Sequence, residues 1–126
     1  MLSIKNLTKI YGGNKKAVND ISLDIEEGEF IAFIGTSGSG KTTALRMINR
    51  MIEPTSGTIT INGEDIMKKN PVQLRRKIGY VIQQIGLLPH MTIKENITLV
   101  PRLLKWSDED KDKKAKELIK LVDLPE

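Results

Sequence analysis

The stretch Gly35-Thr36-Ser37-Gly38-Ser39-Gly40-Lys41-Thr42 decides how the rest of the chain is interpreted. It fits the pattern G-x-x-x-x-G-K-[ST], in which glycines let the backbone wrap with its N–H groups turned toward an anionic phosphate chain. Lys41 is predicted to reach the β- and γ-phosphates as a positive charge, and the Thr42 hydroxyl to ligate Mg²⁺. Thr43 would add a contact to the α-phosphate. The stretch therefore predicts a phosphate-binding loop.

The sequence on both sides of the loop agrees with this interpretation. Residues 30–34 form an unbroken apolar run between two glycines, which predicts a strand buried on both faces. After the loop, apolar residues recur at helical spacing until Pro54 ends the segment: Ala44, Leu45, Ile48 and Ile52. Strand, loop and helix stand in the required order, so a Gly/Ser-rich turn that matches by chance is the weaker interpretation.

Composition narrows the class of protein. A chain of 126 residues is one domain or less, and the absence of cysteine excludes disulfides and cysteine-based zinc sites. No apolar run approaches the roughly 20 residues of a membrane span. The net charge is +4, but lysines and arginines lie among acids and no basic patch is interleaved with aromatic residues. Nucleic acid is therefore not an expected partner.

Alternating apolar and polar residues predict an antiparallel sheet in the first half of the chain. Residues 2–11 and 18–26 alternate and are separated by a glycine turn. Residues 58–61 and 64–66 flank Asn62-Gly63, which is a strong hairpin signal. Together these segments predict an antiparallel layer beside the phosphate-binding loop.

The second half is predicted to be more helical. After Pro71 a short helix leads to residues 78–82, a second apolar run that predicts a buried strand ending at Gln83. Residues 83–91 then predict a loop with exposed apolar side chains.

Two helices are predicted after this loop. Thr92 and Glu95 have the spacing of a capping box and start a helix that Pro101 is expected to interrupt. A second helix should follow Ser107, with acids in its first turn. Its predicted buried stripe is Ala115, Leu118, Ile119 and Val122.

Several motifs, taken in order, resemble the ATP-binding subunits of ABC transporters. They are Tyr11-Gly12-Gly13, the phosphate-binding loop, residues 53–59, residues 78–83, Leu88-Pro89-His90-Met91-Thr92 and Glu95-Asn96-Ile97. Residues 47–50, 83–90 and 100–106 are similar more narrowly to importers of glycine betaine, choline, carnitine and related osmoprotectants.

The resemblance implies roles for two further residues. The aromatic ring at Tyr11 would stack on adenine, although by itself a tyrosine at a strand end could equally well cover the sheet. Gln83 would touch Mg²⁺ and the attacking water. The implied site thus binds ATP and Mg²⁺, with Lys41 and Gln83 in catalytic roles and Thr42 and Gln83 as metal ligands.

The resemblance also implies a fold and partners. The expected fold is α/β, a partial P-loop NTPase with an N-terminal antiparallel β layer, part of the parallel core sheet, and the start of a helical subdomain. Residues 1–91 would be the ATP-binding part, and residues 92–126 would begin the helical subdomain. The implied partners are a membrane permease bound through residues 83–106, a second ATPase subunit and, indirectly, a substrate-binding protein. The expected location is the cytoplasmic face of the membrane.

Three motifs of the family are not found in the sequence. They are the signature motif, the apolar strand that ends in Asp and Glu, and the switch histidine. The expectation is therefore an N-terminal portion of an ABC ATPase that binds nucleotide without hydrolysing it, and that associates through unpaired strands. A small phosphoryl-transfer kinase and a non-catalytic interaction module that retains the loop are the alternatives.

Overall fold

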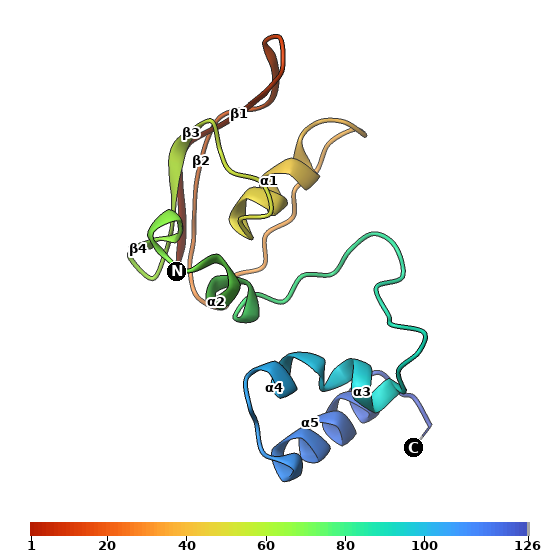
Figure 1. The fold of residues 1–126 in the computed structure, drawn as a ribbon. Coiled ribbons are helices and arrows are strands. Elements are labelled where there is room, and N and C mark those ends of the chain that lie inside the picture. Colours follow the sequence, from red (N-terminus) through yellow and green to blue (C-terminus); the bar gives the residue numbers. More distant parts are fainter. Residues whose placement is uncertain (126) are drawn as a thin grey trace. The chain divides into compact units, whose positions relative to one another are not determined.

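The computed structural model describes residues 1–125 and separates them into two compact units, Met1–Gly79 and the residues from Tyr80 onward. Each unit is described by itself. The first contains these elements (Figure 1): β1 (Leu2–Tyr11), β2 (Lys15–Ile25), α1 (Lys41–Ile48), β3 (Ser56–Ile61), β4 (Glu64–Asp65), the 3-10 helix η1 (Ile66–Lys68) and α2 (Pro71–Arg76).

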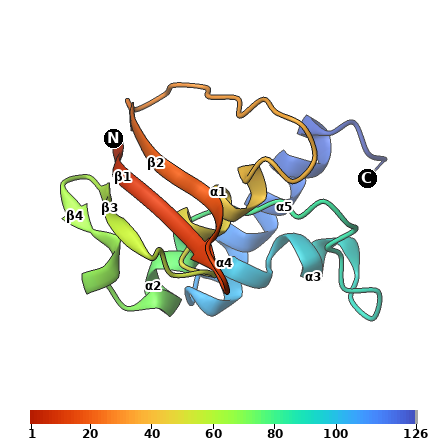
Figure 2. The same ribbon diagram turned by 90° about the horizontal axis from the view of Figure 1, so that it is seen from above.

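The four strands form one antiparallel sheet in the order β2-β1-β3-β4. Figure 2 shows β1 lying between β2 and β3. Leu2 pairs with Ile25 on one side and with Ile61 on the other. Asn62 and Gly63 join β3 to β4 with φ values of 50° and 78°, the pair of positive φ angles that a type I′ hairpin requires. The predicted antiparallel layer is therefore confirmed.

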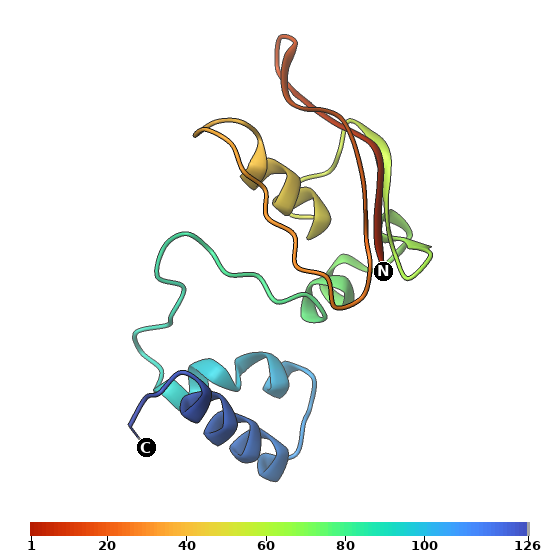
Figure 3. The ribbon, with the colours of Figure 1, turned by 180° about the vertical axis from the view of Figure 1, so that it is seen from behind.

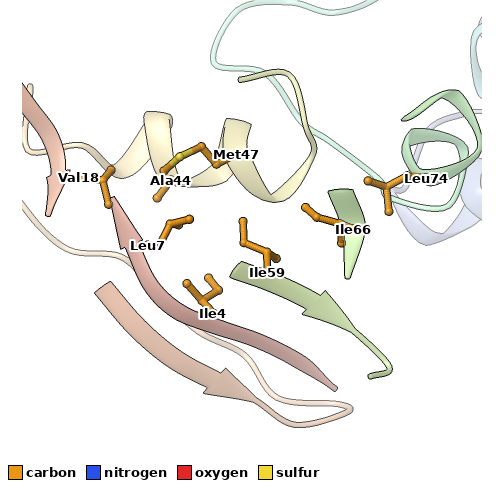
Figure 4. Close-up of a cluster of buried hydrophobic side chains, with 8 residues drawn as sticks. All are labelled: Ile4, Leu7, Val18, Ala44, Met47, Ile59, Ile66 and Leu74. Atoms are coloured by element: carbon orange, nitrogen blue, oxygen red, sulfur yellow. The ribbon is translucent and has the colours of Figure 1, made fainter. Parts of the chain in front are cut away.

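The core of this unit lies between the sheet and its helices (Figure 4). Its buried side chains are Ile4, Leu7, Val18, Ala44, Met47, Ile59, Ile66 and Leu74. Helix α1 contributes Ala44 and Met47, and Ile48 and Ile52 pack against the cluster half-buried. Leu45 was expected on this face but is 46 % exposed, because Ala44 and Met47, three residues apart, define the buried stripe. Burial of this stripe is what holds α1 against the sheet.

Arg50 ends helix α1 and anchors it. Its φ of 51° is left-handed, and the N–H of Met51 donates to the carbonyl of Arg46 at 2.8 Å, as in a Schellman motif. A non-glycine residue in this conformation is strained. The Arg50 guanidinium donates to the carbonyls of Ile66 (3.1 Å) and Lys69 (2.7 Å). The end of α1 is thereby fixed to η1.

The structure does not form the two predicted core strands. Residues 30–34 and 78–82 carry no strand, and Phe30, Ile34 and Val81 are 91 %, 94 % and 97 % exposed. Figure 3 shows residues 30–34 as part of the irregular connection from β2 to α1. The prediction was wrong for these segments because an apolar run gives only a tendency toward strand. A strand needs a neighbouring strand to share its backbone hydrogen bonds. No described residue pairs with residues 30–34 or 78–82 in this way.

The second unit consists of the helices α3 (Ile93–Ile97), α4 (Leu99–Leu103) and α5 (Asp108–Leu121). The capping box of Thr92 and Glu95 is confirmed. The backbone N–H of Thr92 donates to the Glu95 carboxylate at 2.8 Å, and this bond lowers the pKa of that carboxyl. None of the helices in residues 1–125 has the length and apolar character needed to cross a membrane.

Pro101 was expected to interrupt the first of these helices, but the break lies earlier, at Thr98. The ring of a proline clashes with the carbonyl four residues before it, which here is Ile97, and the proline has no N–H to donate. Helix α3 ends at Ile97, so Pro101 fits into the first turn of α4.

Helix α5 starts as predicted, with the Ser107 hydroxyl accepting from the Asp110 N–H at 3.1 Å. Of its predicted buried stripe, Ala115 is buried and Leu118 and Ile119 are half-buried. Val122 is 62 % exposed, because the helix ends at Leu121 and Val122 no longer follows the helical face. An ion pair of 2.5 Å between Lys94 and Asp112 joins α3 to α5, and the hydrogen bond within it raises the pKa of Lys94.

Asn96 ties the turn before α3 to the helix. Its Oδ1 accepts from the Leu88 N–H at 2.7 Å. The two hydrogens of its Nδ2 are shared among the carbonyls of Leu88 (3.1 Å), Met91 (3.2 Å) and Thr92 (2.9 Å). One half-buried amide thus partners the Leu88 N–H and the Met91 carbonyl, and it adds a second bond to the carbonyls of Leu88 and Thr92, which also accept from the N–H groups of Met91 and Asn96.

Replacing this amide should loosen the turn. We expect Asn96→Ala to destabilise the second unit by about 2 kcal/mol, because the half-buried Leu88 N–H and Met91 carbonyl lose their side-chain partner. Native-state hydrogen exchange measures this, and the Leu88 amide should exchange much faster. Thr98→Val is the control, since it removes a single side-chain bond to the Lys94 carbonyl. Equal exchange rates at Leu88 in the Asn96→Ala variant and the parent chain would contradict the prediction.

Candidate nucleotide-binding site

The predicted phosphate-binding loop leads directly into the N-terminus of α1. A turn closes within it, where the Ser39 N–H donates to the Thr36 carbonyl at 3.1 Å. Gly40 precedes the helix and offers no side-chain cap, and the first turn of α1 carries no acidic residue. The first N–H groups of the helix are therefore left without a side-chain acceptor from the N-cap. A helix end of this kind favours an anionic ligand through its N–H groups and its dipole.

Lys41 lies inside the curve of the loop. Its ammonium donates to the carbonyls of Gly35 (2.5 Å) and Thr36 (2.8 Å) and to the Ser39 hydroxyl (3.2 Å). These three contacts hold the loop closed on the lysine, so the sequence from Gly35 to Lys41 forms one structural unit. The positive charge is held where the loop turns, and the predicted contact of Lys41 with the β- and γ-phosphates stays a prediction. A phosphate bound in the loop would compete for the Lys41 ammonium with the two carbonyl oxygens and the Ser39 hydroxyl.

Gly40 is required by the way the loop packs on the sheet. Its φ is +96°, and a Cβ atom at this position would stand 2.1 Å from the Ala17 carbonyl oxygen on β2. Gly38 also has a positive φ, of +80°, but nothing lies within 4 Å of its place for a Cβ. Of these two loop glycines, Gly40 alone combines a left-handed backbone with close packing against the backbone of β2.

This pair of glycines allows a matched test. We expect Gly40→Ala to lower the free energy of unfolding by about 3 kcal/mol or more, because strain and overlap with the Ala17 carbonyl add together. Gly38→Ala should lower it by only about 1 kcal/mol, from backbone strain alone. Urea unfolding followed by circular dichroism measures both values. Equal losses for the two variants would show that the contact with β2 has no energetic effect.

The threonines of the motif are placed at the start of α1. Thr42 is exposed and Thr43 is half-buried. No group of three or more acidic or histidine side chains within residues 1–125 could hold a metal ion. A bound Mg²⁺ would take the Thr42 hydroxyl and oxygens of the nucleotide as ligands, which suits the oxygen preference of this ion. The loop, the helix end and Thr42 together fit a nucleotide with its Mg²⁺.

Two other predicted site residues lie outside the loop. Tyr11 ends β1 and is 41 % exposed, so one part of its ring is accessible. Gln83 is exposed and belongs to the second unit, and its role remains a prediction. Sequence reasoning missed Lys9, whose Nζ lies 5.4 Å from the centroid of the Tyr11 ring. The available signal was a lysine two residues before the tyrosine on a predicted strand.

Comparison with known proteins decides the family. The sequence profile described as ABC transporter matches residues 18–126. The chain belongs to the ABC transporter family. It is 68 % identical over 126 residues to a carnitine transport ATP-binding protein of Listeria monocytogenes. It is 64 % identical over 124 residues to a glycine betaine/carnitine/choline transport ATP-binding protein of Bacillus subtilis, and 52 % identical over 128 residues to an osmoprotectant import ATP-binding protein of Salmonella typhimurium.

These matches include all or nearly all of this ABC transporter chain, between 98 % and 100 %. The chain spans about a third of the length of these relatives, 32 % to 34 %. Among solved structures it resembles the ATP-binding cassette MJ0796, in a dimeric post-hydrolysis state bound to ADP and Pi, with a TM-score of 0.84 and 37 % identity. The match covers 100 % of this chain and 59 % of that one. The predicted P-loop NTPase fold of the ABC ATPase type is thus confirmed.

Proposed function

We propose that this chain carries the ATP-binding part of an importer ATPase that couples ATP binding and hydrolysis to the uptake of a quaternary amine osmoprotectant. The relatives with the highest identity quoted above are ATP-binding proteins for carnitine, for glycine betaine, carnitine and choline, and for osmoprotectants. The single observation that carries the proposal is that the loop closes around Lys41 at the N-terminus of α1. The chain's membership of the ABC transporter family gives this loop its proposed role.

The proposed chemistry follows from the residues of the site. The N–H groups at the start of α1 and the Lys41 ammonium bind and orient the phosphates. The Thr42 hydroxyl holds Mg²⁺, which when bound neutralises charge on the phosphates. Gln83 would position the attacking water and contact the metal ion. The motifs that polarise this water in the family are not found in residues 1–126, so the chain by itself is expected to bind ATP without hydrolysing it.

The proposed partners follow from exposed apolar groups and from the family. Ile85 and Leu87 are 88 % and 67 % exposed in the loop after Gln83, which supports residues 83–106 as the surface that meets a membrane permease. Crosslinks from Leu87 to the permease should appear when the two proteins are present together, and crosslinks confined to residues 1–28 would contradict this assignment. A second ATPase subunit and, indirectly, a substrate-binding protein complete the proposed assembly at the cytoplasmic face of the membrane.

A titration with Mg-ATP tests the proposed binding. Calorimetry should show a single binding event, while phosphate release stays at the background rate. Turnover in the presence of an acceptor would instead indicate a phosphoryl-transfer kinase. Absence of any binding would indicate an interaction module that keeps the loop without using it.

The role of Tyr11 has its own expected outcome. Tyr11→Phe should keep the affinity for ATP, because either ring can stack on adenine. Tyr11→Ala should lose about 1 to 3 kcal/mol of binding free energy, the scale of base stacking on aromatic side chains. Calorimetric dissociation constants for the three chains measure this. An unchanged alanine variant would refute stacking and leave the phosphate-binding loop as the only site.

A further inference from the structure

Lys9 and Tyr11 form a contact that the nucleotide-binding motifs do not explain. They lie two residues apart near the end of β1, and the Lys9 ammonium stands over the Tyr11 ring, 5.4 Å from its centroid. A cation in this position is attracted by the negative face of the ring. It also covers that face. A base that stacked on Tyr11 would then be confined to the opposite face.

The lysine is itself held in place. Its Nζ donates to the Glu53 carbonyl at 2.8 Å, in the segment that follows α1. The same segment is fixed to β1 by two further bonds: the Thr55 N–H donates to the Thr8 carbonyl at 2.9 Å, and the Thr55 hydroxyl accepts from the Ile10 N–H at 3.0 Å. The Lys9 side chain is therefore restrained, whereas the side chain of an exposed lysine rotates freely.

We propose that Lys9 is a positioning residue for nucleotide binding, which fixes the Tyr11 ring from one side so that its other side receives a purine base. This inference rests on the proposed function, in which Tyr11 stacks on the base. It adds a residue that acts on the base only through the ring. The affinity for the phosphate chain should not depend on Lys9, because the phosphates are bound by Lys41 and the start of α1.

The test uses the 126-residue chain and two ligands, Mg-ATP and Mg-tripolyphosphate, which lacks the base. Lys9→Met keeps the length of the side chain and removes the ammonium. We expect it to weaken ATP binding about two- to fivefold, the scale of an exposed cation–π contact. Tripolyphosphate binding should not change.

Two control variants accompany this test. Lys9→Arg should keep the ATP affinity of the parent chain, since it keeps both the cation and the hydrogen-bond donor. Lys5→Met, at an exposed position on the same strand, is the matched control and should bind both ligands as the parent chain does.

A double-mutant cycle with Tyr11→Ala shows whether Lys9 acts through the ring. In the alanine background, Lys9→Met should have no further effect on ATP binding. Equal losses for ATP and tripolyphosphate would overturn the proposal, since they would indicate a general charge effect or a damaged fold. If Lys9→Met weakened ATP binding by the same factor in the parent chain and in the Tyr11→Ala variant, that result would also overturn the proposal. If Tyr11→Ala binds ATP normally, base stacking itself fails, whereas an effect of Tyr11→Ala without one of Lys9→Met would refute the role of Lys9 alone.

Discussion

Lys41→Ala should nearly abolish nucleotide binding by this chain. The substitution removes the positive charge inside the loop and the three contacts that close the loop around it. Loss of charged hydrogen bonds to phosphate corresponds to about 2 to 3 kcal/mol, or roughly 30- to 150-fold in the dissociation constant. Calorimetry with Mg-ATP measures the change. Removal of Mg²⁺ with a chelator should weaken the parent chain as well.

Arg46→Ala is the matched control for this variant. It removes a positive charge from an exposed position of α1 and leaves the loop contacts intact. We expect it to bind Mg-ATP within about twofold of the parent chain, because an exposed charge of this kind is screened by salt. Equal dissociation constants for the parent chain and Lys41→Ala would show that the nucleotide does not use this loop.

The 126-residue chain should associate with other chains in solution. Residues 30–34 and 78–82 are apolar and pair with no described strand, and Phe30, Ile34 and Val81 are almost fully exposed. Unpaired backbone groups beside exposed apolar side chains promote strand exchange or aggregation. Light scattering should therefore give a mass above that of one chain, rising with concentration.

Charged residues at these positions should reduce the association. Ile34→Lys combined with Val81→Lys would place charges on both apolar runs, and the apparent mass should fall toward that of one chain. Ser37→Lys, at an exposed position in the loop, controls for the added charge. A monodisperse monomer of the parent chain, with cooperative unfolding and steady phosphate release, would contradict both the association and the expected lack of hydrolysis.

Features with local causes could be predicted from the sequence. The hairpin at Asn62-Gly63 needs two positive φ angles, and these residues tolerate them better than others. The capping box of Thr92 and Glu95 and the Ser107 cap depend on groups three residues apart. The closed loop around Lys41 likewise depends on six consecutive positions after Gly35. In each case the interacting atoms belong to one short segment.

Features that depend on distant partners could not be predicted in this way. Residues 30–34 have the composition of a buried strand, but a strand exists only where another strand accepts its hydrogen bonds. Arg50 binds the carbonyls of Ile66 and Lys69, and Lys9 binds that of Glu53, contacts that span 16 to 44 residues. No periodicity or motif shows which backbone carbonyl a long cationic side chain will reach.

The contact between Gly40 and the Ala17 carbonyl has a consequence for how this region can vary. Both partners are main-chain atoms, so exchanging the side chain at position 17 leaves the spacing unchanged. The length of β2 matters instead. An insertion among residues 12–14 would be absorbed by the hairpin turn, whereas a deletion between Lys15 and Val18 would move a different carbonyl against Gly40. Insertions and deletions in natural or engineered variants should therefore occur in the turn at residues 12–14 and not in the first residues of β2.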